Sequence, residues 1–236
     1  MDRGDRAEAD REAFLGILSH ELRTPVTTIY GGAKILATHD LSPERRRAIA
    51  TDVSLEAERL YRLVEDLIVL ARWERDDIHP VHEPVAVGHL TTEAIEREIV
   101  ARPGLQIHFL GSRDAATDGA DEGMVAHVLR NLLDNAIRHA GVAGQIEVMI
   151  DASSDEVIVR IVHHGDGPIP GGDAFDLSRS PTTAAGRSGA GIALYVARRL
   201  VEAMRGRIWA VSASAATTEF GFALRRGESA TAVVSA

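Results

Sequence analysis

The chain has 236 residues, of which 45% are hydrophobic and 26% are charged, and it carries no cysteine and a formal net charge of −9. This length suits one large domain or two small ones, and the composition is ordinary for a protein with a packed core. The lack of cysteine excludes disulfides and thiolate-bound zinc or iron–sulfur sites. The acidic balance argues against nucleic acid as the main partner, because phosphate backbones are bound by clustered Lys and Arg.

No apolar run in the sequence approaches the roughly 20 residues that a membrane-spanning helix requires. The first six residues, MDRGDR, lack the apolar core of a signal peptide. We therefore expect a cytoplasmic protein with no membrane contact within this chain, either on its own or as the core of a longer, membrane-associated protein.

Two amphipathic helices are predicted in the first third of the chain. Apolar residues recur at steps of three and four over residues 10–38 and again from Val53 to Ala71. Ser42 suits the N-cap of the second helix and Pro43 its first position, and this helix is expected to end near residue 74. Because the apolar faces are broad, we expect two hairpins to pair as a homodimeric four-helix bundle. Packing of one hairpin onto the rest of its own chain is the alternative.

A second domain is predicted after a linker at residues 76–82, where Pro80 and Pro84 favour extended backbone. Helices are expected at 87–100, 122–139 and 191–204, and strands at 105–110, 145–150, 156–163, 207–212 and 219–224. Mostly antiparallel strands with helices on one side indicate an α/β sandwich, so the fold class of the whole chain is α+β. The predicted parts are residues 1–75, 76–82, 83–226 and a disordered tail, 227–236.

The segment SHELRTP at residues 19–25 combines an imidazole, a carboxylate and a hydroxyl. At about 100° per residue His20 lies opposite the apolar stripe, so its imidazole is expected to be exposed. A neutral imidazole is a competent nucleophile, Glu21 can accept its ring proton, and Thr24 lies one turn further on, where its hydroxyl can position a water. A zinc protease is not expected, because Thr24 stands where the second histidine ligand is required.

A second polar cluster lies in the helix predicted at 122–139. The side chains that share one side of this helix, at i, i+4, i+7 and i+8, are Asn131, Asn135, Arg138 and His139. Asparagine is a mediocre helix former, so two within one turn indicate a ligand. An amide oxygen is a suitable hard ligand for Mg²⁺.

Two glycine-rich loops follow this helix. Gly165 and Gly167 lie in the string HHGDGPIP at residues 163–170, and Gly189 and Gly191 lie in GRSGAGIAL at 186–194, which leads into a helix. Bare glycine backbone and a helix N-terminus both suit phosphate oxygens. A Walker-type nucleotide site is excluded, because the sequence lacks its glycine–lysine string and its only lysine lies in the first helix.

Together these strings resemble the sensor histidine kinases of two-component signalling, over about residues 10–224. The resemblance implies a dimerisation and histidine-phosphotransfer hairpin followed by a GHKL-type ATP-binding domain of the Bergerat fold. His20 would be the phosphoacceptor, assisted by Glu21 and Thr24, and an Asp of a response regulator receiver domain would take the phosphoryl group next. The ATP and Mg²⁺ contacts would come from Asn131, Asn135, Arg138, His139, His163, Gly165, Gly167, Gly189 and Gly191, with Asn135 as the metal ligand.

His163 departs from the family pattern, because it stands where an Asp carboxylate accepts the adenine amino hydrogen. A neutral imidazole can accept one hydrogen bond, whereas a protonated one leaves the donor unpaired at about 1–3 kcal/mol. Arg187 also replaces a family glycine, and the lid at residues 170–186 is short. We therefore expect weak nucleotide binding that falls further in acid. The alternatives are a dimeric phosphotransfer or phosphatase module without ATP use and a purely structural dimerisation scaffold.

Overall fold

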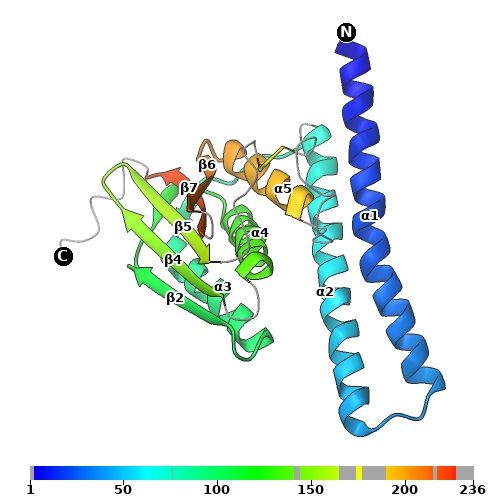
Figure 1. Cartoon of the computed structure of the whole chain (residues 1–236). Helices are drawn as coiled ribbons and strands as arrows, with labels where there is room; N and C mark the ends of the chain where they lie inside the picture. The colour runs from blue at the N-terminus through cyan, green and yellow to red at the C-terminus, as the bar shows by residue number, and fades with distance from the viewer. Residues whose placement is uncertain are drawn as a thin grey trace. The chain divides into compact units, whose positions relative to one another are not determined.

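The computed structural model describes residues 3–75, 77–140, 144–164, 174–176, 190–214 and 217–226. They fall into two compact units. The first contains the first two helices, and the second contains both sheets, the next two helices and the last helix from Ala193 onward. The elements are α1 Arg3–Thr38, α2 Pro43–Glu74, β1 Glu83–Val85, α3 Val87–Ala101, β2 Gln106–Gly111, β3 Thr117–Ala120, α4 Glu122–Ala140, β4 Gln145–Ala152, β5 Glu156–His164, α5 Ala190–Ala203, β6 Arg207–Ser214 and β7 Thr217–Arg225 (Figure 1).

The first unit is the predicted helical hairpin. Its second helix begins as expected, because Ser42 Oγ accepts a hydrogen bond from the Arg45 backbone N–H at 3.3 Å and Pro43 is the first helical residue. The two helices approach closely at Gly32, where an added Cβ would lie 2.4 Å from Val53 Cγ2. A glycine is therefore required for this packing.

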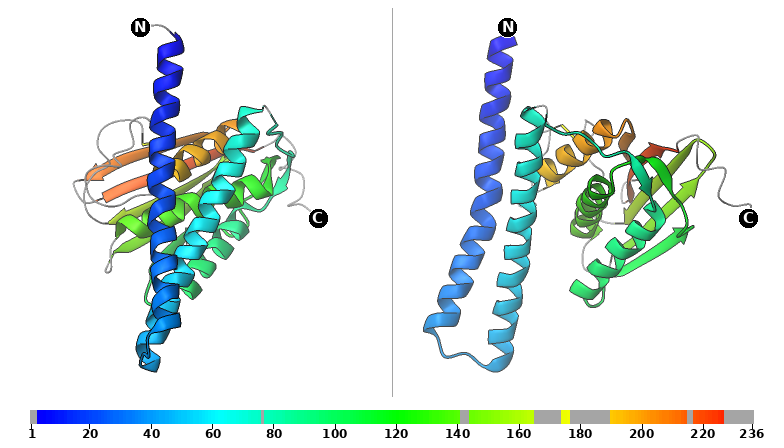
Figure 2. Two further views of the ribbon diagram at one scale, coloured as in Figure 1. Left: turned by 90° about the vertical axis from the view of Figure 1, so that its right-hand side faces the viewer. Right: turned by 180° about the vertical axis from the view of Figure 1, so that it is seen from behind.

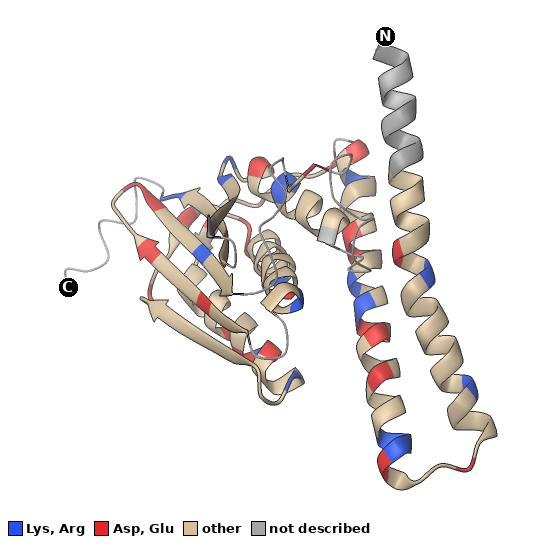
Figure 3. Ribbon diagram, in the orientation of Figure 1, with Lys and Arg blue, Asp and Glu red and all other residues tan. Residues whose placement is uncertain are grey.

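Apolar side chains remain exposed on the hairpin of the single chain. They include Leu15, Val26, Tyr30, Ile35, Leu55, Tyr61, Val64 and Ile68, with Tyr30 69% and Tyr61 64% exposed. Acidic and basic positions are interspersed along α2 (Figure 3). So many large apolar side chains exposed on two helices favour an interaction site on the hairpin. None of the helices in the described part of the chain has an apolar stretch long enough to cross a bilayer.

The second unit is built on a five-stranded sheet of order β2-β4-β5-β7-β6, in which β2 pairs with β4 in parallel and the other pairs are antiparallel. Helices α3, α4 and α5 lie on one face of it (Figure 2). Strands β1 and β3 form a small antiparallel sheet that the sequence does not predict, because each is only three or four residues long. The fold class, a helical hairpin followed by an α/β sandwich, is confirmed.

Alternation along β5 decides which of its side chains enter the core. Val157, Val159 and Ile161 are buried, and the next residue of this series is His163. The helical side of the core is supplied by α4, where Leu129, Leu132, Leu133 and Ala136 are fully buried. The sheet and α4 therefore place His163 and the asparagines of α4 in the same unit.

Candidate functional site

His20 lies on α1 with its side chain exposed, which confirms the predicted orientation. Ser19, the residue before His20, donates its Oγ hydroxyl to the Leu15 carbonyl at 2.8 Å, and one turn after His20 the Thr24 Oγ1 hydroxyl donates to the His20 carbonyl at 3.5 Å. Both hydroxyls thus bond back to the helix, and Thr24 is exposed on the same face as His20. The ring is open to a reactant, and its role as phosphoacceptor stays a prediction.

Glu21 differs from its neighbour, because its side chain is only 3% exposed. Arg59 of α2 lies 3.7 Å from its carboxylate and also 3.7 Å from Glu56. Glu21 is therefore buried beside a cation that the second helix supplies. The sequence places Glu21 beside His20 but gives no sign of Arg59, which is one of several arginines along α2.

Asn131 and Asn135 of α4 are both buried, with 4% and 1% exposure, although they are polar. The Asn131 amide donates to the Ala193 carbonyl of α5 at 3.0 Å. Among the described residues, nothing donates a hydrogen bond to Asn135 Oδ1, which is itself buried. An unpaired buried oxygen carries a free-energy cost and calls for a ligand, an ion or a water. This oxygen fits the role of Mg²⁺ ligand that the resemblance implies.

Arg138 and His139 point to different neighbours. Arg138 forms an ion pair with Asp134 one turn earlier, and Asp134 also lies 3.7 Å from Arg102 of α3. Arg138 is therefore engaged within the protein in this structure. Asp134 is not among the predicted site residues, although its i, i+4 spacing to Arg138 is a recognisable signal of an ion pair.

His139 instead lies near His163, with ring centroids 6.0 Å apart. His163 is 3% exposed and stacks against Phe220 of β7, at 6.0 Å between centroids and 13° between planes. Burial, followed by repulsion from His139 and His164, lowers the pKa of His163 to about 4. Its imidazole is neutral at pH 7, and among the described residues nothing bonds to the buried Nδ1. No local signal in the sequence identifies Phe220 as its partner.

The glycine loops are described only in part. Gly191 is buried in the first turn of α5, as the predicted loop-to-helix junction requires. Gly165, Gly167 and Gly189 lie outside the described residues, as do most of the predicted lid and the predicted tail. Their roles stay predictions.

Comparison with known proteins identifies both units. Residues 10–76 match the His Kinase A (phospho-acceptor) domain, and residues 120–228 match the histidine kinase-, DNA gyrase B- and HSP90-like ATPase family. Sensor histidine kinase WalK of Bacillus subtilis is 29% identical over 235 residues, covering 93% of this chain and 37% of WalK.

Two solved structures share the fold. Histidine kinase AdeS of Acinetobacter baumannii has a TM-score of 0.63 at 20% identity, covering 88% of this chain and 98% of AdeS. Histidine kinase ThkA in complex with response regulator protein TrrA has a TM-score of 0.62 at 20% identity, covering 96% of this chain and 64% of that one. The chain spans less than half the length of the curated relatives YvrG, WalK and TcrY. Because its residues match both the phosphoacceptor and the ATPase domain families of histidine kinases, and its curated relatives are sensor histidine kinases, the chain belongs to the sensor histidine kinases of two-component systems.

Proposed function

We propose that the chain is an ATP-dependent protein histidine kinase core that autophosphorylates His20 and passes the phosphoryl group to an Asp of a response regulator. The domains would be residues 1–75 for dimerisation and phosphotransfer, 76–82 as linker and 83–226 for ATP binding. The observation that carries the proposal is an exposed imidazole on the phosphoacceptor domain together with an unpaired buried amide oxygen, Asn135 Oδ1, in the ATPase domain.

The chemistry follows from these two groups. A nitrogen of His20 would form a bond to the γ-phosphorus of ATP while the bond from that phosphorus to the β–γ bridging oxygen breaks, releasing ADP. Glu21, held by Arg59, would accept or retain the second ring proton as positive charge develops on the imidazole. Mg²⁺ bound through Asn135 would neutralise phosphate charge, so catalysis would consist mainly of positioning and electrostatic stabilisation.

The exposed apolar row on the hairpin supports a homodimer. Side chains such as Tyr30 and Tyr61 are more than half exposed in the single chain, and pairing with a second hairpin would bury them in a four-helix bundle. The ThkA complex supports a response regulator receiver domain as the second partner of this chain.

The direct test is incubation of the full chain with Mg²⁺ and ATP labelled on the γ-phosphate. We expect label that is stable in alkali and lost in acid, and none in His20→Gln. His39→Gln is the matched control, because His39 is also exposed and follows the last residue of the same helix. Undiminished labelling of His20→Gln would overturn the assignment.

A second function is favoured by one observation, the imidazole of His163 in place of a carboxylate. If ATP is not used, His20, Glu21 and Thr24 would serve a dimeric phosphotransfer or phosphatase module. Titration with ATP at millimolar concentration separates the two: the kinase binds ATP, whereas the module exchanges phosphate with a phosphorylated receiver domain without it.

A further inference from the structure

His163 is a buried histidine whose placement the phosphotransfer chemistry does not explain. It lies at the end of the central strand β5, and its ring is stacked on Phe220 and faces His139. Most buried polar atoms have a hydrogen-bond partner. Within the described residues, His163 Nδ1 has none and is fully inaccessible to water. The atom is therefore placed to bond to something that the chain itself does not supply.

The chemistry of this atom differs from that of a carboxylate. An ionised Asp only accepts hydrogen bonds, so it favours a base carrying an amino group and repels one carrying an oxo group. A neutral imidazole carries one N–H and one bare nitrogen, and the proton can sit on either nitrogen. Among the described residues, His163 Nδ1 has no hydrogen-bond partner that would fix whether it carries the proton. Nδ1 can therefore accept from an amino group or donate to an oxo group.

We propose that His163 makes the nucleotide site tolerant at position 6 of the purine, so that ATP and GTP bind with similar affinity. This inference rests on the proposed function, since it assumes that the ATPase domain binds a nucleoside triphosphate. The stacking on Phe220 holds the ring in one orientation while the proton changes nitrogen, so the same ring can pair with either base.

The alternative interpretation is that His163 is an ordinary core residue, because it continues the alternation of buried side chains along β5. An ordinary core residue at this position would leave no buried nitrogen unpaired, because such an atom lowers stability. His164 shows the contrast one residue further on. Its exposed ring shares a hydrogen bond of 3.1 Å with Thr217 Oγ1 across to β7.

The test is calorimetric titration of the full chain with Mg²⁺ and three nucleotides: ATP, GTP and purine riboside triphosphate, which lacks a substituent at position 6. We expect the Kd values for ATP and GTP to agree within about tenfold, and purine riboside triphosphate to bind more weakly than either, because its hydrogen bond is missing. His163→Asp should shift the ratio to at least about tenfold in favour of ATP.

Two further variants keep the result interpretable. His163→Asn also offers a donor and an acceptor, so it should keep the two Kd values within about tenfold. His164→Asp places the same charge on the exposed neighbour and should leave the ratio unchanged. Circular dichroism checks that each variant is folded.

Three outcomes would overturn the inference. One is a wild-type preference for ATP far above tenfold, and another is a ratio of Kd values that His163→Asp leaves unchanged. Both leave ATP binding, and hence the proposed kinase, intact. Failure of the wild type to bind any of the three nucleotides contradicts the proposed function as well.

Discussion

The guanidinium of Arg59 lies 3.7 Å from the carboxylate of Glu21, so a cation from α2 faces the residue that follows the proposed phosphoacceptor. Glu21 is buried while His20 beside it is exposed. The helix thus presents its nucleophile to solvent and keeps the adjacent carboxylate against the second helix, where Arg59 fixes its position.

Arg59→Met is expected to slow autophosphorylation about tenfold, because Glu21 loses the ion pair that positions it for proton transfer. Nucleotide affinity should stay unchanged, since Arg59 lies in the other domain. Arg62→Met is the matched control on α2, as it removes the ion pair of Arg62 with Glu58 at 2.7 Å. Initial rates with labelled ATP provide the measurement, and equal rates for the two variants would contradict a positioning role.

Asn135→Leu is expected to separate stability from function. It removes a buried unpaired oxygen and should raise the free energy of unfolding by about 1 kcal/mol, while Mg²⁺-dependent ATP binding is lost. By contrast, Asn131→Leu should lower the free energy of unfolding by about 1–3 kcal/mol, because the Ala193 carbonyl loses its hydrogen-bond donor. Denaturant titration without nucleotide, followed by ATP binding with and without Mg²⁺, measures both effects. A loss of stability in Asn135→Leu would show that its oxygen is paired in solution.

The buried imidazole of His163 should make stability depend on pH. The unfolded chain takes up this proton near pH 6.5, whereas the pKa of about 4 in the folded chain delays uptake. Between these values the unfolded state binds more protons, so stability falls as pH falls, by about 3 kcal/mol between pH 7 and pH 4. His163→Asn should not show this loss of unfolding free energy, because it has no imidazole to protonate. If the unfolding free energies of the two proteins fell in parallel between pH 7 and pH 4, this role of His163 would be refuted.

The same pKa also changes the expected acid dependence of nucleotide binding. An ordinary histidine would lose the hydrogen bond to the adenine amino group near pH 6.5. Because burial, and then repulsion from His139 and His164, oppose its protonation, His163 should retain this bond until about pH 4. Between pH 7 and pH 5.5, titration of His163 should therefore cause almost no change in ATP affinity. A tenfold loss over that range in the wild type, absent in His163→Asn, would show that the ring titrates normally.

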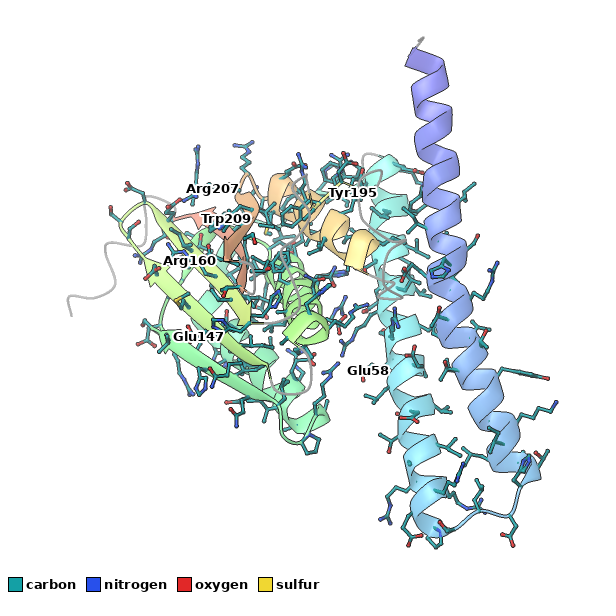
Figure 4. All side chains as sticks on the ribbon, viewed as in Figure 1. Glu58, Glu147, Arg160, Tyr195, Arg207 and Trp209 are labelled. Atoms are coloured by element: carbon teal, nitrogen blue, oxygen red, sulfur yellow. The ribbon has the colours of Figure 1, made fainter. Side chains whose placement is uncertain are left out.

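Gly221→Ala is expected to destabilise the second unit by about 1–3 kcal/mol. Trp209 of β6 lies across Gly221 of β7, and an added Cβ would come within 2.3 Å of its ring. The indole is held there by a 2.9 Å hydrogen bond to Glu219 and by Arg207, whose guanidinium carbon lies 5.1 Å from the ring centroid (Figure 4). Gly119→Ala in β3 is the control, because its Cβ would meet only the Arg225 carbonyl at 3.7 Å. Thermal unfolding compares the two, and equal midpoints would contradict the packing argument.

The sequence alone determined the locations of most elements and the exposure of His20. Both depend on the spacing of apolar residues within one helix or strand, which is local information. Small strands such as β1 were not predicted, because three residues are too few to show an alternation of apolar and polar side chains. The substitution of His163 for a carboxylate was likewise visible in the string around it.

Only the tertiary structure decided what these residues touch. Arg59 faces Glu21 because of how the two helices pack, and Phe220 lies beside His163 because of the pairing between β5 and β7. The hydrogen bond from Asn131 to Ala193 depends on where α5 meets α4. Contacts between elements far apart in the chain follow from packing and strand register, which side-chain periodicity within one element does not encode.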